Sequence, residues 1–237
     1  MRANRYFAVA ALAGVCVSCA SNGPLVVGPD PKPPATCKAS GGQEQLLLVD
    51  WSGEDRGELE AAAKRGTVVV QYANCEMQVL PRCRAYGSYH YTPLNPKHSS
   101  LAINDEESLY ASLPLGAAKL AGKLRSSGSL SVSMMMIGKF DSDVGSVRRG
   151  ELAGDCDQAT HVVTAITVGA FELSSASASG GETEISLFDA GLRGGKTRSR
   201  QILNRDGDPN ACEQSESTSG SPPSRCSAVM RVALKAL

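Results

Sequence analysis

The chain has 237 residues with 24 basic and 24 acidic side chains, so its formal net charge is zero. This balance excludes a protein that binds nucleic acid by charge alone. Hydrophobic residues make up 42% of the chain but aromatic residues only 5%, so the core is expected to rest on Val, Leu, Ala and Met. No apolar run reaches the roughly 20 residues that a membrane-spanning helix needs.

The N-terminus has the three parts of a secretory signal. Arg2 and Arg5 form a basic segment, an apolar run follows over residues 7–17, and small residues come next. The apolar run is too short to cross a membrane as a helix. We therefore expect residues 1–18 to be a signal peptide.

The residues at the expected cleavage site carry a resemblance. The run Cys16-Val17-Ser18-Cys19 resembles the lipobox of bacterial prolipoproteins, in which a small residue precedes the modified cysteine. The resemblance implies cleavage before Cys19, a diacylglyceryl thioether on Cys19 with palmitate-type chains, and a mature chain held on the membrane by this lipid. Ala20 follows, which by resemblance to enteric-type sorting implies the outer membrane of the cell envelope, with the domain facing the periplasm or the cell surface. Ordinary secretion with cleavage nearby is the alternative.

Six cysteines remain in the mature chain, and we expect them to form disulfides. Loss of residues 1–18 leaves 22 basic and 24 acidic residues, a net charge of −2. An even number of cysteines in an oxidising compartment is typical of a disulfide framework, although sequence alone does not choose the pairing. No C-x-x-C pair is present in the mature chain, so no zinc site is expected. The candidates are Cys37, Cys75, Cys83, Cys156, Cys212 and Cys226, with Cys75–Cys83 and Cys212–Cys226 as short loops that a disulfide would close.

Composition divides the mature chain into a tether and one domain. Residues 19–43 are rich in proline and glycine, and we expect an extended tether there. A single domain is expected over 44–237. Its predicted elements are a buried strand over 45–51, a helix over 54–64, strands over 67–72 and 76–80, helices over 104–128 that divide near Pro114 and Gly116, strands over 129–140, 160–173, 183–188 and 228–237, and a polar loop over 205–225.

Local signals place the helix starts and the fold class. Ser52 and Asn104 are the expected N-caps, because a short polar side chain there accepts a hydrogen bond from the first turn. In the strand over 129–140, alternation predicts that Leu130, Val132, Met134, Met136 and Phe140 point to one face. Two or three helices among mainly antiparallel strands predict an α+β fold stapled by disulfides.

Tyrosines gather in the segment before the predicted helices. Tyr89 and Tyr91 alternate on one face of a strand, and Tyr86 lies just before it. Clustered tyrosines bind glycans and peptides well, so a binding face for an envelope protein or a glycan is one interpretation. A packed, half-buried strand is the other.

No segment has the spacing of a catalytic, nucleotide or metal site. Residues 190–197 fit only a relaxed phosphate-loop pattern that lacks the first Gly, and a solvated glycine turn is expected. Residues 206–210 begin like a calcium loop but lack its later Gly and Glu. Asp155, Asp157 and His161 lie close in sequence, which fits either acid–base work or a helix end that leads into a strand. We expect no catalytic residues, no cofactor, no metal, no nucleotide and no nucleic acid partner.

A second resemblance lies in residues 158–170. Thr160, His161 and Gly169 match the signature of membrane-attack-complex/perforin proteins, in which an aromatic-Gly-Thr/Ser-His-aromatic run is followed six residues later by Gly-Gly; the other signature positions differ. In that family the glycines let a central strand bend, and flanking segments become amphipathic membrane hairpins. The family's domains are longer than this one. The resemblance implies a protein that perturbs membranes.

Together these patterns favour a lipid-anchored protein of the cell envelope that binds or assembles with a partner and is not an enzyme. A perforin-like membrane-perturbing protein is the first alternative. An envelope hydrolase without a recognised motif is the second.

Overall fold

The computed structural model describes residues 44–176, Phe188 and residues 200–237, all of them in one unit of the chain, Pro33–Leu237. Several predictions lie outside these described residues: the signal peptide 1–18, the lipid site Cys19, the tether 19–43 with Cys37, the strand over 183–188 apart from Phe188, and the turn over 190–197.

The first strand and helix form for local reasons. β1 (Glu44–Leu47) leads through buried Leu48 into a turn, and α1 (Gly53–Ala63) follows. The Ser52 side chain accepts a hydrogen bond from the Asp55 N–H at 3.1 Å, which satisfies one of the first N–H groups of the helix. The predicted N-cap at Ser52 is therefore confirmed.

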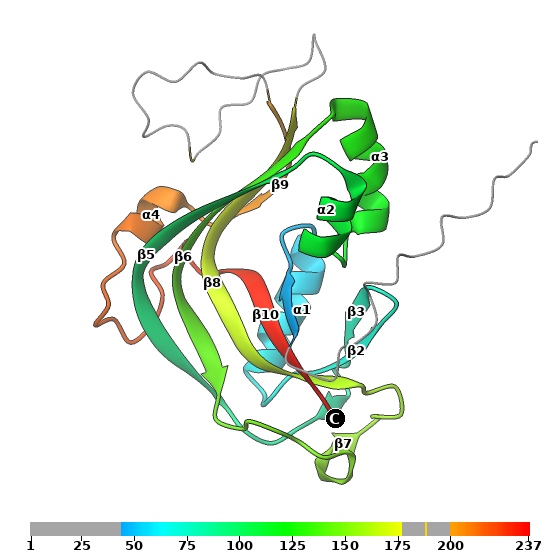
Figure 1. The fold of residues 1–237 in the computed structure, drawn as a ribbon. Helices are drawn as coiled ribbons and strands as arrows, with labels where there is room; N and C mark the ends of the chain where they lie inside the picture. The colour runs from blue at the N-terminus through cyan, green and yellow to red at the C-terminus, as the bar shows by residue number, and fades with distance from the viewer. Residues whose placement is uncertain (1–43, 177–187, 189–199) are drawn as a thin grey trace, which may run out of the picture. The chain divides into compact units, whose positions relative to one another are not determined.

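The other strands form one antiparallel sheet and one small separate pair. Their bounds are β2 (Val69–Ala73), β3 (Glu76–Val79), β5 (Tyr89–Ile103), β6 (Leu130–Ser142), β8 (His161–Ala176), β9 (Arg200–Asp206) and β10 (Ala228–Ala236) in the sheet, and β4 (Cys83–Arg84) with β7 (Ala153–Gly154) in the pair. β5, β6, β8 and β9 pair in that order (Figure 1). β8 is the central strand, because it pairs with β2 and then β6 along one edge and with β10 and then β9 along the other.

Two helices connect β5 to β6, and a short one follows β9. These are α2 (Glu106–Ser112), α3 (Ala117–Ser127) and α4 (Pro209–Glu213), and a single 3-10 turn spans Arg149–Glu151. The predicted division near Pro114 and Gly116 is confirmed, but Asp105 caps α2 and not Asn104. The Asp105 carboxylate accepts a hydrogen bond from the Ser108 N–H at 2.8 Å, because only the residue directly before the helix is placed to reach that group.

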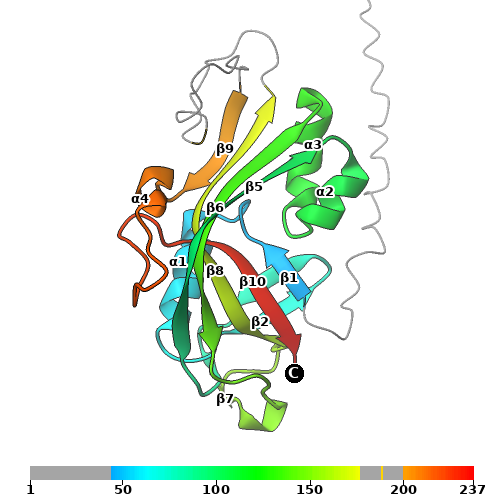
Figure 2. The ribbon, with the colours of Figure 1, turned by 60° about the vertical axis from the view of Figure 1, so that its left-hand side comes forward.

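Helices cover the two faces of the sheet. α2 and α3 bury Leu109, Leu113 and Leu124 against Val132 and Phe171. α1 lies over another part of the sheet, where Leu59 joins a cluster with residues of β2, β8 and β10. Figure 2 shows α2 and α3 on one side of the long strands and α4 on the other. The layers fit an α+β fold, with four α-helices among the described residues.

One prediction about the faces of this sheet needs correction. Leu130, Val132, Met134 and Met136 contact one core cluster as predicted, but Phe140 packs in a different one. The reason is a register shift between Met136 and Gly138, which ends the simple alternation. The structure also resolves the disulfide pairing that the sequence left open: Cys83 pairs with Cys156, and Cys212 pairs with Cys226. Cys75 is disulfide-bonded as well.

Candidate functional site

One transverse row of residues ends the four-stranded part of the sheet. Ile103 of β5 pairs with Leu130 of β6, Leu130 pairs with Ser175 of β8, and Ser175 pairs with Gln201 of β9. The connection from β5 to β6, which holds α2 and α3, and the connection from β8 to β9 both start at this row. Two neighbouring hairpins therefore share one end of the sheet (Figure 1).

The long strands of the sheet curve (Figure 1), and the β6–β8 register shifts next to Gly169 of β8, where a bend is expected. A Cβ atom at Gly169 would overlap the carbonyl oxygen of Met135 and lie 2.9 Å from Met230 Cε, so only glycine fits. Gly207 approaches from the other side with φ +76°, and a Cβ there would lie 2.6 Å from the Gly169 oxygen. The backbone of β8 is thus enclosed at the point where its second neighbour changes from β10 to β9.

Irregular pairing in the neighbouring strands accompanies the bend. The β5–β6 register shifts between Pro93 and Lys97, and the β6–β8 register shifts between Met136 and Gly138. Such bulges bend a strand and increase its twist. Tyr91 lies over Gly138, where its hydroxyl donates a hydrogen bond to the Ile137 carbonyl at 3.2 Å.

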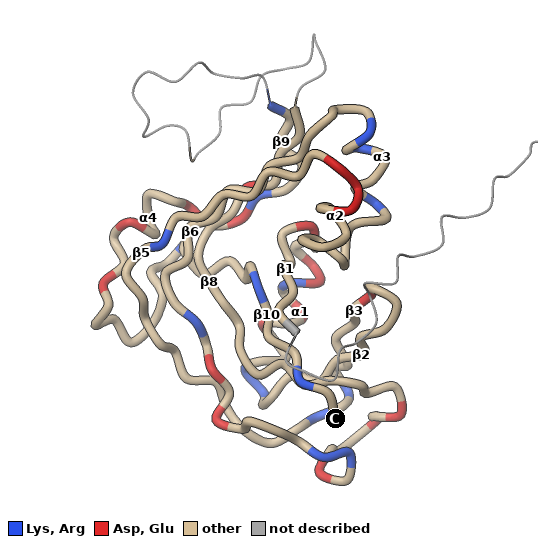
Figure 3. Tube along the Cα trace, viewed as in Figure 1, with Lys and Arg blue, Asp and Glu red and all other residues tan. Residues whose placement is uncertain are grey.

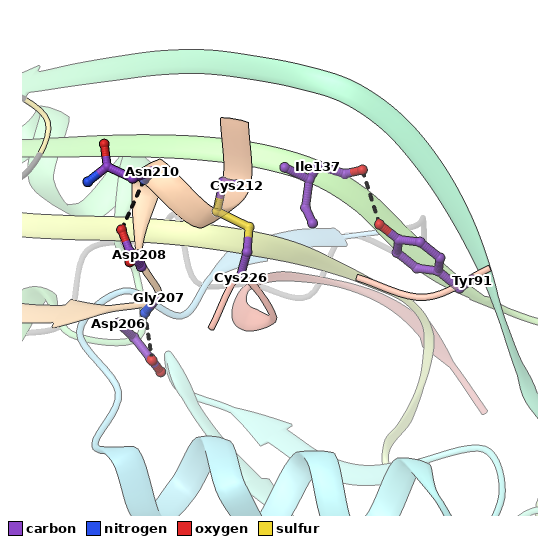
Figure 4. Close-up of a disulfide and its surroundings, with 8 residues drawn as sticks. All are labelled: Tyr91, Ile137, Asp206, Gly207, Asp208, Asn210, Cys212 and Cys226. Carbon is purple, nitrogen blue, oxygen red and sulfur yellow. Dashed lines mark hydrogen bonds between the residues drawn. A yellow bond between two sulfur atoms is a disulfide. The ribbon is translucent and has the colours of Figure 1, made fainter. Parts of the chain in front are cut away.

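A disulfide-held segment packs against one face of the bend (Figure 4). Cys212 and Cys226 are fully buried, and they join a cluster with Met135, Ile137 and Ala170. The Asp208 carboxylate caps α4 by accepting a hydrogen bond from the Asn210 N–H at 3.0 Å. The residues that resembled the start of a calcium loop therefore serve the turn and the helix that carry Cys212.

The helical connection lies on the opposite face and carries separated charges. Asp105, Glu106 and Glu107 occupy the start of α2, whereas α3 holds cations and no acid (Figure 3). One ion pair joins the two helices, between Arg125 Nε and Glu106 Oε1 at 3.4 Å. The buried contacts of α2 and α3 are aliphatic, so the sheet holds these helices mainly through the hydrophobic effect.

The predicted tyrosine cluster has packing roles at two of its three positions. The hydroxyl of the half-buried Tyr89 donates to the Val163 carbonyl at 2.7 Å and accepts from the Val68 N–H at 3.1 Å. Burial raises the pKa of Tyr89 and, less strongly, that of Tyr91. Tyr86 is 58% exposed, so of the three it offers the most surface to a partner. Binding of an envelope protein or a glycan by these tyrosines stays a prediction, and Tyr86 is the residue that could contact such a partner most directly.

Thr160 and His161, the other two residues that match the perforin signature, lie at the start of β8. The Tyr72 N–H donates to Thr160 Oγ1 at 2.7 Å, and His161 Nδ1 lies 2.9 Å from the same oxygen. The His161 ring is buried and meets Tyr72 edge to face. Thr160 and His161 thus join β8 to β2, whereas Gly169 stands at the bend.

A buried polar cluster beside the sheet was not predicted. Arg56 is 4% exposed and donates to the Trp51 carbonyl at 2.6 Å and to Asp206 Oδ2 at 3.2 Å. Its guanidinium also lies 5.0 Å from the centre of the Phe171 ring. The Asn204 amide bonds the Trp51 carbonyl from the other side. Because Arg56 and Asp206 are 150 residues apart in the chain, no local pattern announces their pairing.

Neither a metal-binding group nor the geometry of a Ser-His-Asp triad is present among the described residues. Among them, no group of three His, Cys, Asp or Glu side chains is placed to hold a metal ion. Ser88, His90 and Asp143 lie together at the surface, but Ser88 Oγ donates to Asp143 at 2.9 Å and both groups face His90 Nε2. A catalytic triad needs the carboxylate on the other ring nitrogen. No helix of the described part is long and apolar enough to span a membrane.

Comparison of the chain with family models, with curated proteins and with solved structures finds no match.

Proposed function

We propose that this chain is a lipid-anchored envelope protein whose domain perturbs membranes, the first alternative that the sequence offers. The observation that carries the proposal is the bent meander β5-β6-β8-β9, with Gly169 at its bend and α2–α3 inserted between two neighbouring strands. A glycine at the bend of a central strand is the role that the perforin resemblance implies.

The connection 104–129 has the length of a membrane hairpin. A membrane strand needs about 9–11 residues, so two strands and a turn take a little over 20. The division at Pro114 and Gly116 would supply the turn. The register of β5 and β6 already ends at Ile103–Leu130, so further pairing would simply extend it.

The connection also alternates as a strand would. Leu109 and Leu113 fall at odd positions before the turn, and Leu120, Gly122 and Leu124 fall at even positions after it. The residues between the latter three include Lys123, and Lys119 and Arg125 flank them, so the second strand of the hairpin would have one apolar face and one charged face. This is the pattern of a strand with one face in lipid.

The helical form depends on its contacts with the sheet. α2 has 7 residues and α3 has 11, and isolated helices shorter than about 12–15 residues are marginal in water. If α2 and α3 lost their contacts with Val132 and Phe171, both segments would therefore leave the sheet and also lose their helical structure.

Dye release from liposomes tests the proposal through Gly122. This residue is exposed on α3, and a Cβ there meets nothing within 4 Å, so the folded domain tolerates a side chain. In the proposed hairpin the same position faces lipid. We expect release by the mature chain and by Gly122→Ala, and at least a tenfold lower rate for Gly122→Asp, since a charge in lipid costs on the order of 2 kcal/mol. Absence of release at micromolar protein, or equal rates for the two variants, would refute the proposal.

The anchor is tested separately. Labelled palmitate is expected on the wild-type chain and not on Cys19→Ala, because the thioether at Cys19 carries the lipid. Equal labelling of the two chains would contradict the lipid anchor without bearing on membrane perturbation.

A binding role is the second candidate, favoured by the exposed Tyr86 ring. Crosslinking of the mature chain in envelope membranes, followed by pulldown, is expected to capture a protein or glycan that Tyr86→Ala loses. Tyr86 is the suitable position because Tyr89 and Tyr91 also hold the fold. Capture that is unchanged in Tyr86→Ala would remove this surface.

A further inference from the structure

The carboxyl group of Asp50, in the turn after β1, contacts the start of α3. A Cβ at Gly116, the N-cap of α3, would overlap the Asp50 carboxyl group, so the Asp50 side chain packs directly against the α3 backbone where only glycine leaves room. The Asp50 carboxyl group has a hydrogen bond from its own backbone N–H. Its Oδ1 atom is buried and has no hydrogen-bond partner in the part of the chain that the structure describes.

Two cations face this carboxyl group, each from a different helix. Lys119 belongs to the first turn of α3, and Arg56 belongs to α1. Arg56 already bonds the Trp51 carbonyl and Asp206, and Lys119 is exposed. Burial therefore outweighs both attractions and raises the pKa of Asp50 from 3.8 to about 6.

We propose that Asp50 is a pH-sensitive latch, in which the neutral carboxyl group holds α3 on the turn after β1 and the ionised group loosens it. The latch regulates the region that the proposed function releases, and to that extent it rests on that function. The docking of α3 itself is measurable without any membrane.

The direction follows from proton linkage. Asp50 binds a proton more tightly when α3 is docked than when water reaches the carboxyl group. Docking is therefore strongest below about pH 4 and weakens as the pH rises to about 6, with little further change above that. The full change in the docking equilibrium is on the order of 100-fold.

Hydrogen exchange of the α3 amides tests the latch in the mature chain. Between about pH 4.5 and 7, wild-type protection over residues 117–127, corrected for intrinsic exchange, is expected to fall by roughly 25-fold. Asp50→Asn mimics the neutral group and is expected to keep full protection at both pH values. Glu58→Gln, on the exposed face of α1, is expected to behave as wild type.

The outcomes separate the latch from the membrane activity. Equal α3 protection in wild type and Asp50→Asn at pH 7 would overturn the latch, whatever the liposomes show. If Asp50→Asn does not fold, the wild type decides alone, since its α3 amides should lose protection over this pH range. If the latch holds and dye release fails, only the proposed function is lost. If both hold, release by wild type should rise from about pH 4.5 to 7, and Asp50→Asn should release slowly at both.

Discussion

Gly169→Ala isolates the enclosed backbone at the bend. The added methyl group would overlap the Met135 carbonyl oxygen and lie 2.9 Å from both the Met135 carbonyl carbon and Met230 Cε. A backbone oxygen in a paired strand cannot move aside as a flexible side chain can. Overpacking in a close-packed core costs about 1–3 kcal/mol, and we expect the upper part of this range.

Urea unfolding of the oxidised mature chain measures this cost. In a thermal melt of a domain of this size, a loss of about 3 kcal/mol in the free energy of unfolding would lower the Tm by roughly 6–12 °C. Gly57→Ala is the matched control, because a Cβ at Gly57 meets nothing within 4 Å and the residue lies within α1. That control should gain about 0.5–1 kcal/mol. If Gly169→Ala stays within 0.5 kcal/mol of wild type, a rough limit for substitutions that touch nothing, the account of the bend is refuted.

Three further predictions concern the staples and caps. Replacing Cys83 and Cys156 by Ala should lower the free energy of unfolding by about 4 kcal/mol, and replacing Cys212 and Cys226 should lower it by about 3 kcal/mol. The first disulfide costs more to lose because it closes the longer loop, with a separation of 73 residues against 14. Urea unfolding of the two double variants measures both losses, and the opposite order would show that loop closure does not dominate. Ser52→Ala should cost about 1 kcal/mol with loss of α1 protection, whereas an unchanged exchange pattern would deny Ser52 its capping role. Hydrogen bonds from Ser108 lower the pKa of Asp105, so the stabilising effect of its carboxylate is present above the ordinary pKa and lost as the pH falls. Asp105→Ala, but not Asn104→Ala, should therefore reduce the hydrogen-exchange protection of the α2 amides at neutral pH and make that protection less sensitive to acid.

Local signals in the sequence predicted the first three helices and most strands, whereas α4 lies in the segment 205–225 that was expected to be a polar loop, and β9 was not predicted. Ser52, Pro114 and the run of β-branched residues before Tyr72 act over a few neighbours, so their effects can be read in order along the chain. The cap at Asp105 was missed by one residue, since Asn104 and Asp105 offer the same chemistry and only the backbone geometry separates them.

Contacts between distant segments could not be predicted in this way. Nothing near Cys83 indicates Cys156 as its partner, and nothing near Arg56 indicates Asp206. The enclosure of Asp50 depends on Gly116, which reaches it only after the long strand β5 and α2 have been placed. Gly169 was singled out because its spacing from His161 matches a known signature, but its close approach to Met135 emerges only from the pairing of β6 with β8.

The burial of Cys212 and Cys226 has a consequence for the order of folding. Both sulfur-bearing side chains are fully buried in the cluster over the bend, so an external oxidant cannot reach them once α4 has docked. The disulfide must therefore form while the segment 207–226 is still open to solvent. A separation of 14 residues favours early closure, because short loops lose little chain entropy. Oxidation of this loop would thus come before the bend is covered, and the finished domain would shield the bond from reductants for as long as it stays folded.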